Sequence, residues 1–338
     1  KGTRTFPVQS RQDAGEPAQT LEDGNAIEIM TGASLPEGAD CIVPVERVTV
    51  NEHGAHVEAN YVAEERQFIH ARASDHEQGA ELLTAGTRIS PMDIAVIASC
   101  GLARVEVAKQ PRTTVISTGN ELVPAGEPIN DHQVRLSNGP TIIAMLANNG
   151  FDQSAHEHVV DEPEVLEERI GKRLADSDVL ILSGGVSMGK ADYVPQVLDE
   201  LDVNVTFHKV GQRPGKPMWF GMGPGGQAVF ALPGNPVSTL VCCRQYVISA
   251  LHHMSGMAAA NPQFASLTQD VTFKPQLTNF LPVRLVSNAA GQALVMPVFT
   301  NTSGDFASLT GTHGYVELAP EQTEFKSGTT VPLHRWRR

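Results

Sequence analysis

Basic residues are scarce in this sequence relative to acidic ones. Lys and Arg together number 25, Asp and Glu number 38, and the formal net charge is −13 at pH 7. Proteins bind the phosphate backbone of nucleic acids mainly through Lys and Arg. We therefore expect no nucleic-acid partner, and an anionic ligand would need positive charge that is gathered locally.

Long apolar runs are also missing. No stretch approaches the roughly 20 apolar residues that a membrane-spanning helix needs, and the first residues, Lys1–Phe6, lack the apolar segment of a signal peptide. We therefore predict a cytoplasmic protein with no membrane partner. The chain has four cysteines, Cys41, Cys100, Cys242 and Cys243. They form no Cys-x-x-Cys pair, so we predict reduced, buried thiols.

Length and pattern predict several domains. At 338 residues, the chain exceeds the roughly 250 residues beyond which a single core stops growing. Short apolar segments separated by turn residues occupy residues 20–108 and return after residue 260, which indicates β structure. Between residues 112 and 255, strand-like segments alternate with helix-like ones. This alternation is typical of a parallel sheet that is covered on both faces.

The predicted fold is therefore a multidomain protein with an α/β central domain between two β-rich domains. We place a β-rich domain at 1–75, a small helical and extended segment at 76–108, the α/β domain at 109–256 and a C-terminal β domain at 257–338. The second segment should contain a helix at Pro91–Ser99, because Pro suits the first helical position. Strands expected before the central domain include Cys41–Val45, Thr87–Ile89 and Ala103–Val107.

Three glycine-rich turns follow predicted strands in the central region, at residues 116–121, 182–189 and 232–238. Loops after parallel strands meet at one edge of a sheet, where such folds bind ligands. Glycine lets backbone N–H groups approach an anion, and a following helix presents its positive end. We therefore predict a site for phosphate or molybdate, although each turn taken alone could be a tight connection. The residues assigned to it are Ser117, Thr118, Gly119, Ser183, Gly184, Gly185, Pro233, Gly234, Asn235 and Pro236.

A fourth turn is basic. It runs from Lys209 to Pro217 and includes Arg213 and Lys216, so three cations lie within eight residues of an otherwise acidic chain. Its prolines restrict φ, which lowers the entropy lost when the cations hold an anion. The alternative is a solvated basic loop without a ligand.

Carboxylates stand close to these turns. Glu121 ends the first turn, Asp161 follows a strand-like segment, and Asp192 lies just beyond the second turn. Mg²⁺ binds one or two carboxylates together with substrate phosphate oxygens, so these residues are candidate metal ligands. Asp161 and Asp192 could instead cap the helices that follow them. The twelve histidines show no HxxxH or HExxH spacing, and we assign none of them to a metal.

These turns, in this order, resemble the molybdopterin molybdenumtransferases, the MoeA family that includes the E-domains of gephyrin and plant homologues. The similarity spans almost the whole chain. The segments that carry it are Ile29–Ala33 with Pro36–Asp40, Ser117–Leu122, Ser183–Ser187 with Ala191–Tyr193, Pro214–Pro217 and Leu232–Ser238.

The resemblance implies a reaction and an architecture. Members of this family bind adenylylated molybdopterin, insert molybdate at the dithiolene and release AMP with the assistance of Mg²⁺. The resemblance implies a central domain similar to the molybdopterin adenylyltransferases, flanking β domains and an elongated homodimer. It also implies a molybdopterin adenylyltransferase as a partner.

The resemblance further implies roles for individual residues. Positions linked to activity or substrate binding are Thr31, Asp75, Glu121, Asp161, Asp192, Lys209, Pro233 and Pro236, and the molybdate pocket would use Lys216, Ser238, Arg284 and Ser303. An oxyanion is well matched by cations and hydroxyls, and Mg²⁺ by carboxylates.

The sequence also departs from the family pattern. The family's N-terminal segment with its Asp-Gly-Tyr-Ala motif has no counterpart here, so we expect the chain to match the family from within the following β domain. Where the family has Gly-Glu-Asp, this sequence has Ala73-Ser74-Asp75. Asn120 stands where the family usually has an acidic residue, Arg213 where it has a lysine, and Leu136 where it often has an aspartate. Two alternatives therefore stay open: adenylylation of molybdopterin itself, and a scaffolding or binding role without catalysis.

Overall fold

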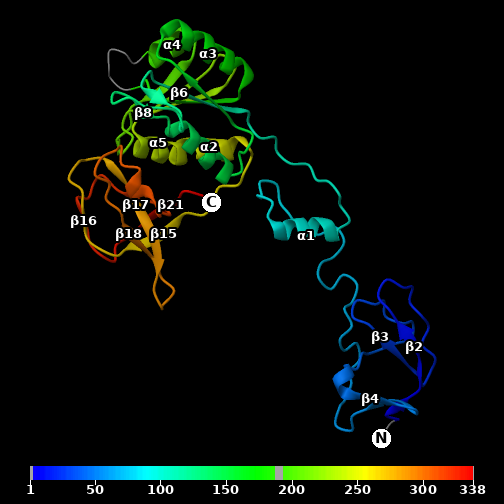
Figure 1. Cartoon of the computed structure of the whole chain (residues 1–338). Helices are drawn as coiled ribbons and strands as arrows, with labels where there is room; N and C mark the ends of the chain where they lie inside the picture. Colours follow the sequence, from blue (N-terminus) through cyan, green and yellow to red (C-terminus); the bar gives the residue numbers. More distant parts are fainter. Residues whose placement is uncertain (1–2, 187–192, 338) are drawn as a thin grey trace. The chain divides into compact units, whose positions relative to one another are not determined.

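The computed structural model describes residues 3–186 and 193–337. The chain divides into two compact units, Lys1–Leu82 and Leu83–Arg338, and some of their elements are labelled in Figure 1. The first unit contains a three-stranded antiparallel sheet in the order β1-β5-β4 and a parallel pair, β2 with β3. The bounds are β1 Thr5–Phe6, β2 Val8–Gln12, β3 Ala26–Ile29, the 3-10 turn η1 Val45–Arg47, β4 Val48–Asn51 and β5 Gly54–Val57.

Three strands expected from the sequence do not form. Cys41–Val45 has no regular structure before η1, and Thr87–Ile89 and Ala103–Val107 are irregular. The backbone N–H of Ile42 bonds to the carbonyl of Gln67, but no ladder follows. Apolar and β-branched residues favour strands only where a neighbouring strand supplies hydrogen bonds.

Helix α1 (Pro91–Ser99) begins and ends where the sequence predicts. Its start is fixed by a capping box: the side chain of Ser90 accepts from the N–H of Asp93, and the carboxylate of Asp93 accepts from the N–H of Ser90. None of its nine residues is buried. Met92 is 73% exposed and Ile94 is 58% exposed, so much of the apolar surface of this helix is left uncovered by the described residues.

The central sheet has six strands in the order β11-β13-β14-β10-β6-β9. Their bounds are β6 Thr113–Thr118, β9 Ala155–Val159, β10 Val179–Ser183, β11 Asn204–His208, β13 Trp219–Met222 and β14 Ala228–Leu232. β9, β6, β10 and β14 are parallel as predicted, but β13 is antiparallel to both of its neighbours. The short turn Gly223–Gln227 explains the difference, because a turn of this length joins only antiparallel strands. A small parallel pair, β7 (Leu122–Val123) and β8 (Val134–Arg135), lies outside this sheet.

Helices cover both faces of the central sheet, as Figure 1 shows. Alternate residues of each strand enter two separate cores: Val115 of β6 packs with the first, whereas Ile116 packs with the second. The period of two in strand side chains produces this division. On one face lie α2 (Asn138–Asn148) and the continuous run α5 (Pro236–Cys242), π-helical η2 (Cys243–Val247) and α6 (Ile248–Met254). On the other lie α3 (Pro163–Asp176) and α4 (Val194–Glu200).

The cysteines only partly follow the prediction. All four are free thiols, and Cys242 and Cys243 are buried in the helical run. Burial raises the pKa of the Cys243 thiol to about 12, so it is protonated at neutral pH. Cys100, in contrast, is exposed, and it follows α1, none of whose residues is buried. The expectation of a buried thiol was wrong there.

The C-terminal region is a closed barrel. β17 (Thr278–Ser287), β18 (Ala293–Pro297), β15 (Gln263–Leu267), β21 (Thr330–Arg335) and β19 (Gly314–Leu318) pair in that order, and β19 pairs back with β17. Closure removes the free edges of the sheet. Inward-facing residues such as Val283, Val295 and Val316 fill the interior. A small pair, β16 (Val271–Thr272) with β20 (Glu324–Phe325), and the 3-10 turn η3 (Ala307–Leu309) complete it.

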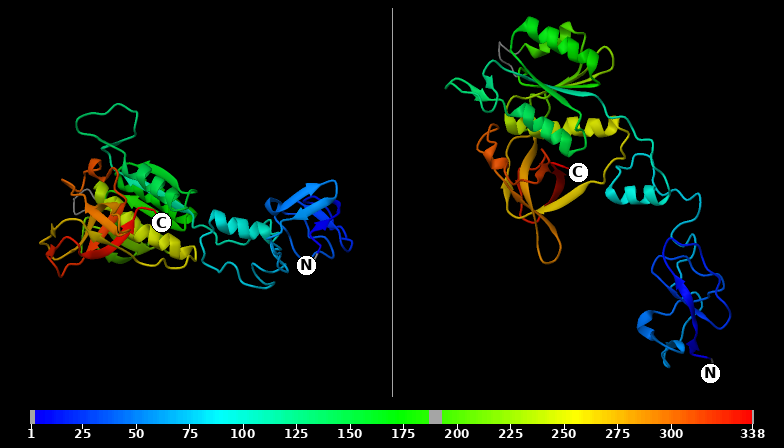
Figure 2. Two further views of the ribbon diagram at one scale, coloured as in Figure 1. Left: turned by 90° about the horizontal axis from the view of Figure 1, so that it is seen from below. Right: turned by 45° about the vertical axis from the view of Figure 1, so that its right-hand side comes forward.

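The barrel is joined to the central domain by backbone as well as side chains, and the two lie together in both views of Figure 2. β12 (Gln212–Arg213), in the basic loop, pairs in parallel with β17. The N–H of Val237 in α5 donates to the carbonyl of Ser303 at 2.9 Å. Val241, Phe280 and Tyr315 form a shared buried cluster. Among the helices of the described residues, none combines the length and apolar character needed to cross a bilayer.

Candidate functional site

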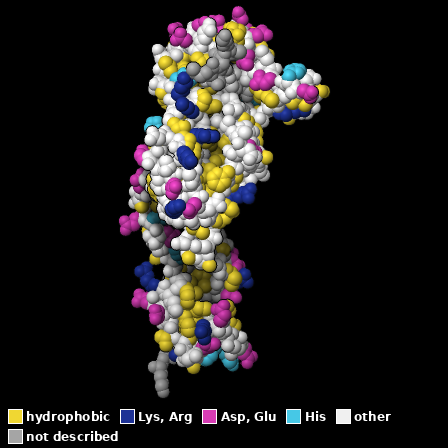
Figure 3. Space-filling view, turned by 90° about the vertical axis from the view of Figure 1, so that its left-hand side faces the viewer, with side chains coloured by type: hydrophobic (Ala, Val, Ile, Leu, Met, Phe, Trp, Pro, Cys, Tyr) yellow, Lys and Arg dark blue, Asp and Glu magenta, His cyan; other side chains and the backbone are white. Residues whose placement is uncertain are grey.

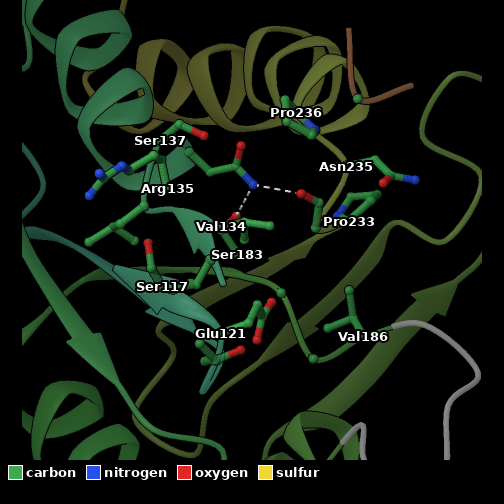
Figure 4. Close-up of a pocket in the computed structure, with 18 of the residues that line it drawn as sticks. Ser117, Glu121, Val134, Arg135, Ser137, Ser183, Val186, Pro233, Asn235 and Pro236 are labelled. Atoms are coloured by element: carbon green, nitrogen blue, oxygen red, sulfur yellow. Dashed lines mark hydrogen bonds between the residues drawn. The ribbon is translucent and has the colours of Figure 1, made fainter. Parts of the chain in front are cut away.

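A cavity of about 760 Å³ lies at the carboxyl ends of β6, β10 and β14. Figure 4 shows residues from three strand-end loops facing this space. The position agrees with the rule that open α/β sheets bind ligands beyond the carboxyl ends of their strands. The lining residues are Ser117, Thr118, Glu121, Leu122, Val134, Arg135, Leu136, Ser137, Asn138, Asp161, Ser183, Gly184, Gly185, Val186, Pro217, Pro233, Gly234, Asn235, Pro236, Gly304 and Phe306.

Hydroxyl groups from adjacent strands form part of the wall. Ser117 of β6 lies opposite Ser183 of β10 in the parallel register, and Thr118 follows Ser117. All three side chains are buried. Thr118 Oγ1 has no hydrogen-bond partner among the described residues. A buried hydroxyl without a partner costs free energy, roughly 1–3 kcal/mol, which a ligand in the cavity would recover.

The turn after β10 requires glycine. Gly184 has φ +105°, and a Cβ at this position would lie 2.6 Å from the carbonyl oxygen of Thr118. The N–H of Gly184 donates to the carbonyl of Leu232 at 3.3 Å, which connects this turn to the end of β14. Gly185 is also at positive φ, and its Cβ would collide with Val194 at 2.7 Å. The two glycines therefore let the turn approach both β6 and α4 closely.

Asn138 holds the walls of the cavity together, and sequence analysis did not assign it. Its Nδ2 donates to Ser183 Oγ at 3.1 Å and to the carbonyl oxygen of Gly234 at 2.8 Å, shown as dashed lines in Figure 4. It thereby ties the start of α2 to the loops after β10 and β14. The adjacent pair Ser137-Asn138 was visible in the sequence only as the neighbour of Leu136. Arg135, Ser137 and Phe306 also line the cavity without having been predicted.

Two of the three predicted carboxylates reach the cavity. Glu121 and Asp161 line it, and the N–H of Asp161 donates to Asn120 Oδ1 at 3.0 Å. The N-cap of α3 is Glu162, with no side-chain capping bond, so Asp161 is not the helix cap that the alternative required. Asp192 lies outside the described residues.

The carboxylates in the described lining of the cavity are suited to Mg²⁺ that is bound jointly by the protein and a ligand, and not to a metal held by protein side chains alone. Within residues 3–186 and 193–337, no group of three or more His, Cys, Asp or Glu side chains could hold a metal by itself. Glu121 and Asp161 do supply the one or two carboxylates that Mg²⁺ uses when ligand phosphates and water complete its shell. A metal held by these two carboxylates would need ligand phosphates and water to complete its shell.

The start of α5 differs from the expectation. We expected its free N–H groups to point at a ligand, but Pro236 has none and the N–H of Val237 is taken by the carbonyl of Ser303. Pro233, Gly234, Asn235 and Pro236 do line the cavity, whereas Ser238 and Ser303 are not among its described lining residues.

The basic loop lies beside the cavity and not in its described lining. Lys209, Arg213 and Lys216 are exposed, and of this loop only Pro217 is a lining residue. Arg135 is the basic residue of the described lining, together with the acidic Glu121 and Asp161. In Figure 3, Lys and Arg side chains stand in separate groups and form no continuous basic surface.

The remaining predicted residues lie elsewhere. Arg284 is exposed on β17, where its Nη2 donates to the carbonyl of Thr310 at 3.4 Å. Gly119, beside the cavity, accepts a hydrogen bond from His158 Nε2 at 2.8 Å. Thr31 and Asp75 belong to the first unit. Asp75 pairs with His70 at 3.2 Å, and residues 70–76 surround a small surface pocket.

The fold and the cavity define a class of protein: a multidomain α/β protein whose candidate ligand site lies at the carboxyl edge of the central sheet and is lined in part by residues of the C-terminal region. Three family models match successive parts of the chain. Residues 1–101 match the MoeA N-terminal region (domain I and II), residues 114–253 match a "Probable molybdopterin binding domain", and residues 265–336 match the MoeA C-terminal region (domain IV).

Whole-chain comparisons agree with the family models. The chain is 35% identical to a molybdopterin molybdenumtransferase from Synechocystis sp., covering 99% of this chain and 84% of the relative. It is 32% identical to one from Staphylococcus aureus, covering 97% of this chain and 78% of the relative. The crystal structure of a molybdopterin biosynthesis MoeA protein from Pyrococcus horikosii matches with a TM-score of 0.77 and 28% identity, covering 99% of this chain and 82% of that one.

The chain therefore belongs to the molybdopterin molybdenumtransferase (MoeA) family, a family of transferases in molybdenum cofactor biosynthesis. The resemblance inferred from the five sequence motifs is confirmed, and so is the expected order of an α/β domain between two β-rich regions.

Proposed function

We propose that this protein inserts molybdate into adenylylated molybdopterin and releases AMP in an Mg²⁺-dependent reaction. The observation that carries the proposal is the cavity at the carboxyl edge of the sheet, where hydroxyls, glycine turns and two carboxylates converge. Phosphate oxygens are matched by hydroxyl and N–H donors, and an attached Mg²⁺ is matched by carboxylates. Family membership supplies the chemical identity of the substrate class.

The chain's own residues would bind and orient the substrate. Thr118 and Ser183 would donate to phosphate oxygens, and Ser117 would do so when its hydroxyl proton faces the cavity, while Gly184 and Gly185 would let the backbone approach them. Glu121 and Asp161, with Asp192, would hold Mg²⁺, which when bound supplies positive charge that stabilises the leaving phosphate. These roles rest on the lining of the cavity by the described members of the set.

Molybdate, the second substrate, would be held by the basic loop and the barrel. Lys216 and Ser238 would bind it from the central domain, and Arg284 and Ser303 from the barrel, while Lys209 and Arg213 would neutralise further negative charge. Support comes from the pairing of β12 with β17, which fixes the basic loop against the barrel. Thr31 and Asp75 would contribute substrate contacts. We also propose a cytoplasmic location and a molybdopterin adenylyltransferase as the donor of the substrate.

The reaction is tested by measuring AMP. Purified protein with adenylylated molybdopterin, Mg²⁺ and molybdate should release AMP in proportion to molybdate added, because cleavage is coupled to metal insertion. Removing Mg²⁺ with EDTA should stop the release, and restoring it should recover the rate. Release of AMP at the same rate without molybdate would refute the proposal. Consumption of ATP with unmodified molybdopterin would instead identify an adenylyltransferase.

We further propose that the protein is a homodimer in which α1 takes part. An apolar helix with Met92 and Ile94 exposed needs a partner. Light scattering should give twice the chain mass for the wild type, and Met92→Glu with Ile94→Glu should shift it toward the single-chain mass. Val45→Glu, at a 77% exposed position of the first unit, serves as the control and should leave the mass unchanged. A wild type that runs as a single chain would contradict this.

A further inference from the structure

A histidine stands directly behind one of the cavity's hydroxyls. His156 lies on β9, and its Nε2 is 3.0 Å from Ser117 Oγ. Ser117 lines the cavity, whereas His156 is not among its described lining residues. The imidazole therefore reaches Ser117 from outside the described lining of the cavity. A hydroxyl has one proton to donate and two lone pairs. If the Ser117 proton or one of its lone pairs is used in the hydrogen bond to His156, that proton or lone pair no longer faces the cavity.

The first turn of α2 leaves room for this contact. A Cβ at Gly139 would overlap His156 Nε2 and would lie 2.6 Å from Ser117 Oγ. Glycine is disfavoured in helices relative to alanine, so helix propensity does not explain a glycine at position 139. The space needed by the His156 imidazole and the Ser117 hydroxyl does explain it.

The charge state of His156 depends on the groups that surround its ring. Burial, and then the neighbouring His158, lower the pKa of His156, while Glu157 acts in the opposite direction. The Glu157 carboxylate is itself bound by Arg169 and Arg173 of α3. From β6 the ring faces the neutral Ser117, and from α2 it faces Gly139. Burial therefore disfavours the charged form of the ring, and His156 gains its proton at a lower pH than an exposed histidine would.

We propose that His156 is a positioning residue that sets the direction of the Ser117 hydroxyl, so that the protonated imidazole turns this hydroxyl into the cavity as a donor to an oxyanion. A neutral Nε2 can accept the Ser117 proton, which leaves only lone pairs facing the cavity. A protonated Nε2 must donate to Oγ, so the hydroxyl proton points elsewhere. The direction of linkage follows: oxyanion binding strengthens as pH falls through the pKa of His156, and a bound oxyanion raises that pKa.

Sulfate is a suitable probe, because it is a tetrahedral oxyanion whose charge does not change between pH 5 and pH 8. Its affinity for the full chain is measured by calorimetry at both pH values, and the His156 ring is followed by NMR. We expect wild-type affinity to rise about fivefold more between pH 8 and pH 5 than that of His156→Gln, the gain expected when a neutral hydrogen bond becomes charge-assisted. Sulfate should also raise the measured pKa of His156.

Two further variants test whether the pH effect comes from the contact between His156 and Ser117 or from a change in the overall charge of the protein. Gly139→Ala keeps the histidine but displaces its ring, so it should lose the pH effect as His156→Gln does. His253→Gln, at an exposed position on α6, should retain it. Equal pH dependence in wild type and both site variants, or a His156 pKa that sulfate leaves unchanged, would overturn the proposal. If His156→Gln does not fold, Gly139→Ala and the wild-type NMR titration decide. The outcome is independent of AMP release.

Discussion

Replacing Asp161 with asparagine is expected to slow molybdate-dependent AMP release by about 100-fold or more. Loss of groups that only support metal ligands typically costs 10–100-fold in metal affinity or activity, so loss of a ligand lies at or beyond that limit. Asparagine keeps the shape of the side chain and the backbone bond to Asn120, and it removes the charge. The cavity should therefore keep its form while its affinity for Mg²⁺ falls. Calorimetric titration of Mg²⁺ in the presence of AMP measures this second effect directly.

Glu162 provides the matched control. It is adjacent, exposed, and makes no capping bond through its side chain. Glu162→Gln removes the same charge one residue away and should change the rate by less than about twofold, because exposed charges act weakly through water. Equal losses of rate in both variants would mean that Asp161 acts only through its negative charge and not as a metal ligand. A nearly normal rate for Asp161→Asn would show that Asp161 is not part of the active site.

Gly184→Ala should have the largest effect on the cavity itself. The added Cβ would meet the carbonyl oxygen of Thr118 at 2.6 Å, and φ is +105°. A non-glycine residue at such φ costs about 1–2 kcal/mol, and overpacking adds about 1–3 kcal/mol. We expect AMP affinity to fall at least about tenfold, because the turn must move away from β6 and carry the binding groups with it. Calorimetry with AMP and thermal unfolding measure the two effects.

Gly226→Ala isolates the backbone contribution. Gly226 has φ +83° with nothing within 4 Å of the added Cβ, and it lies in the turn between β13 and β14, outside the cavity lining. This variant should lose about 1–2 kcal/mol of stability and keep its AMP affinity. If the two alanine variants behave alike, contact with Thr118 has no role in shaping the site.

The parts of the fold that follow from short-range rules were predictable. Pro91 predicts the first residue of α1, and the structure adds a capping box between Ser90 and Asp93 at the same place. The glycine turns follow apolar strands in a sheet whose side chains alternate between two cores, and they meet at one edge. Both inferences need only local chain chemistry and the geometry of parallel strands.

What escaped prediction depends on contacts between distant segments. Asn138 matters because Ser183 and Gly234 come within reach of its amide, and nothing near it in sequence announces this. The N–H of Val237 was expected to be free, but the barrel supplies the carbonyl of Ser303. Thr87–Ile89 has strand composition but pairs with no strand in the part of the chain that the structure describes. For Asn138 and Val237 the atoms that decide the outcome lie far away along the chain.

The way the barrel is attached restricts how this protein can be cut and recombined. A chimera that transplanted only residues 109–256 would lose the carbonyl that satisfies Val237, the edge that receives β12, and the lining residues Gly304 and Phe306. Val241 would also be left facing water. Domain exchanges between relatives should therefore transfer the central domain and the barrel together. A junction between the two domains would run through the cavity that both of them line.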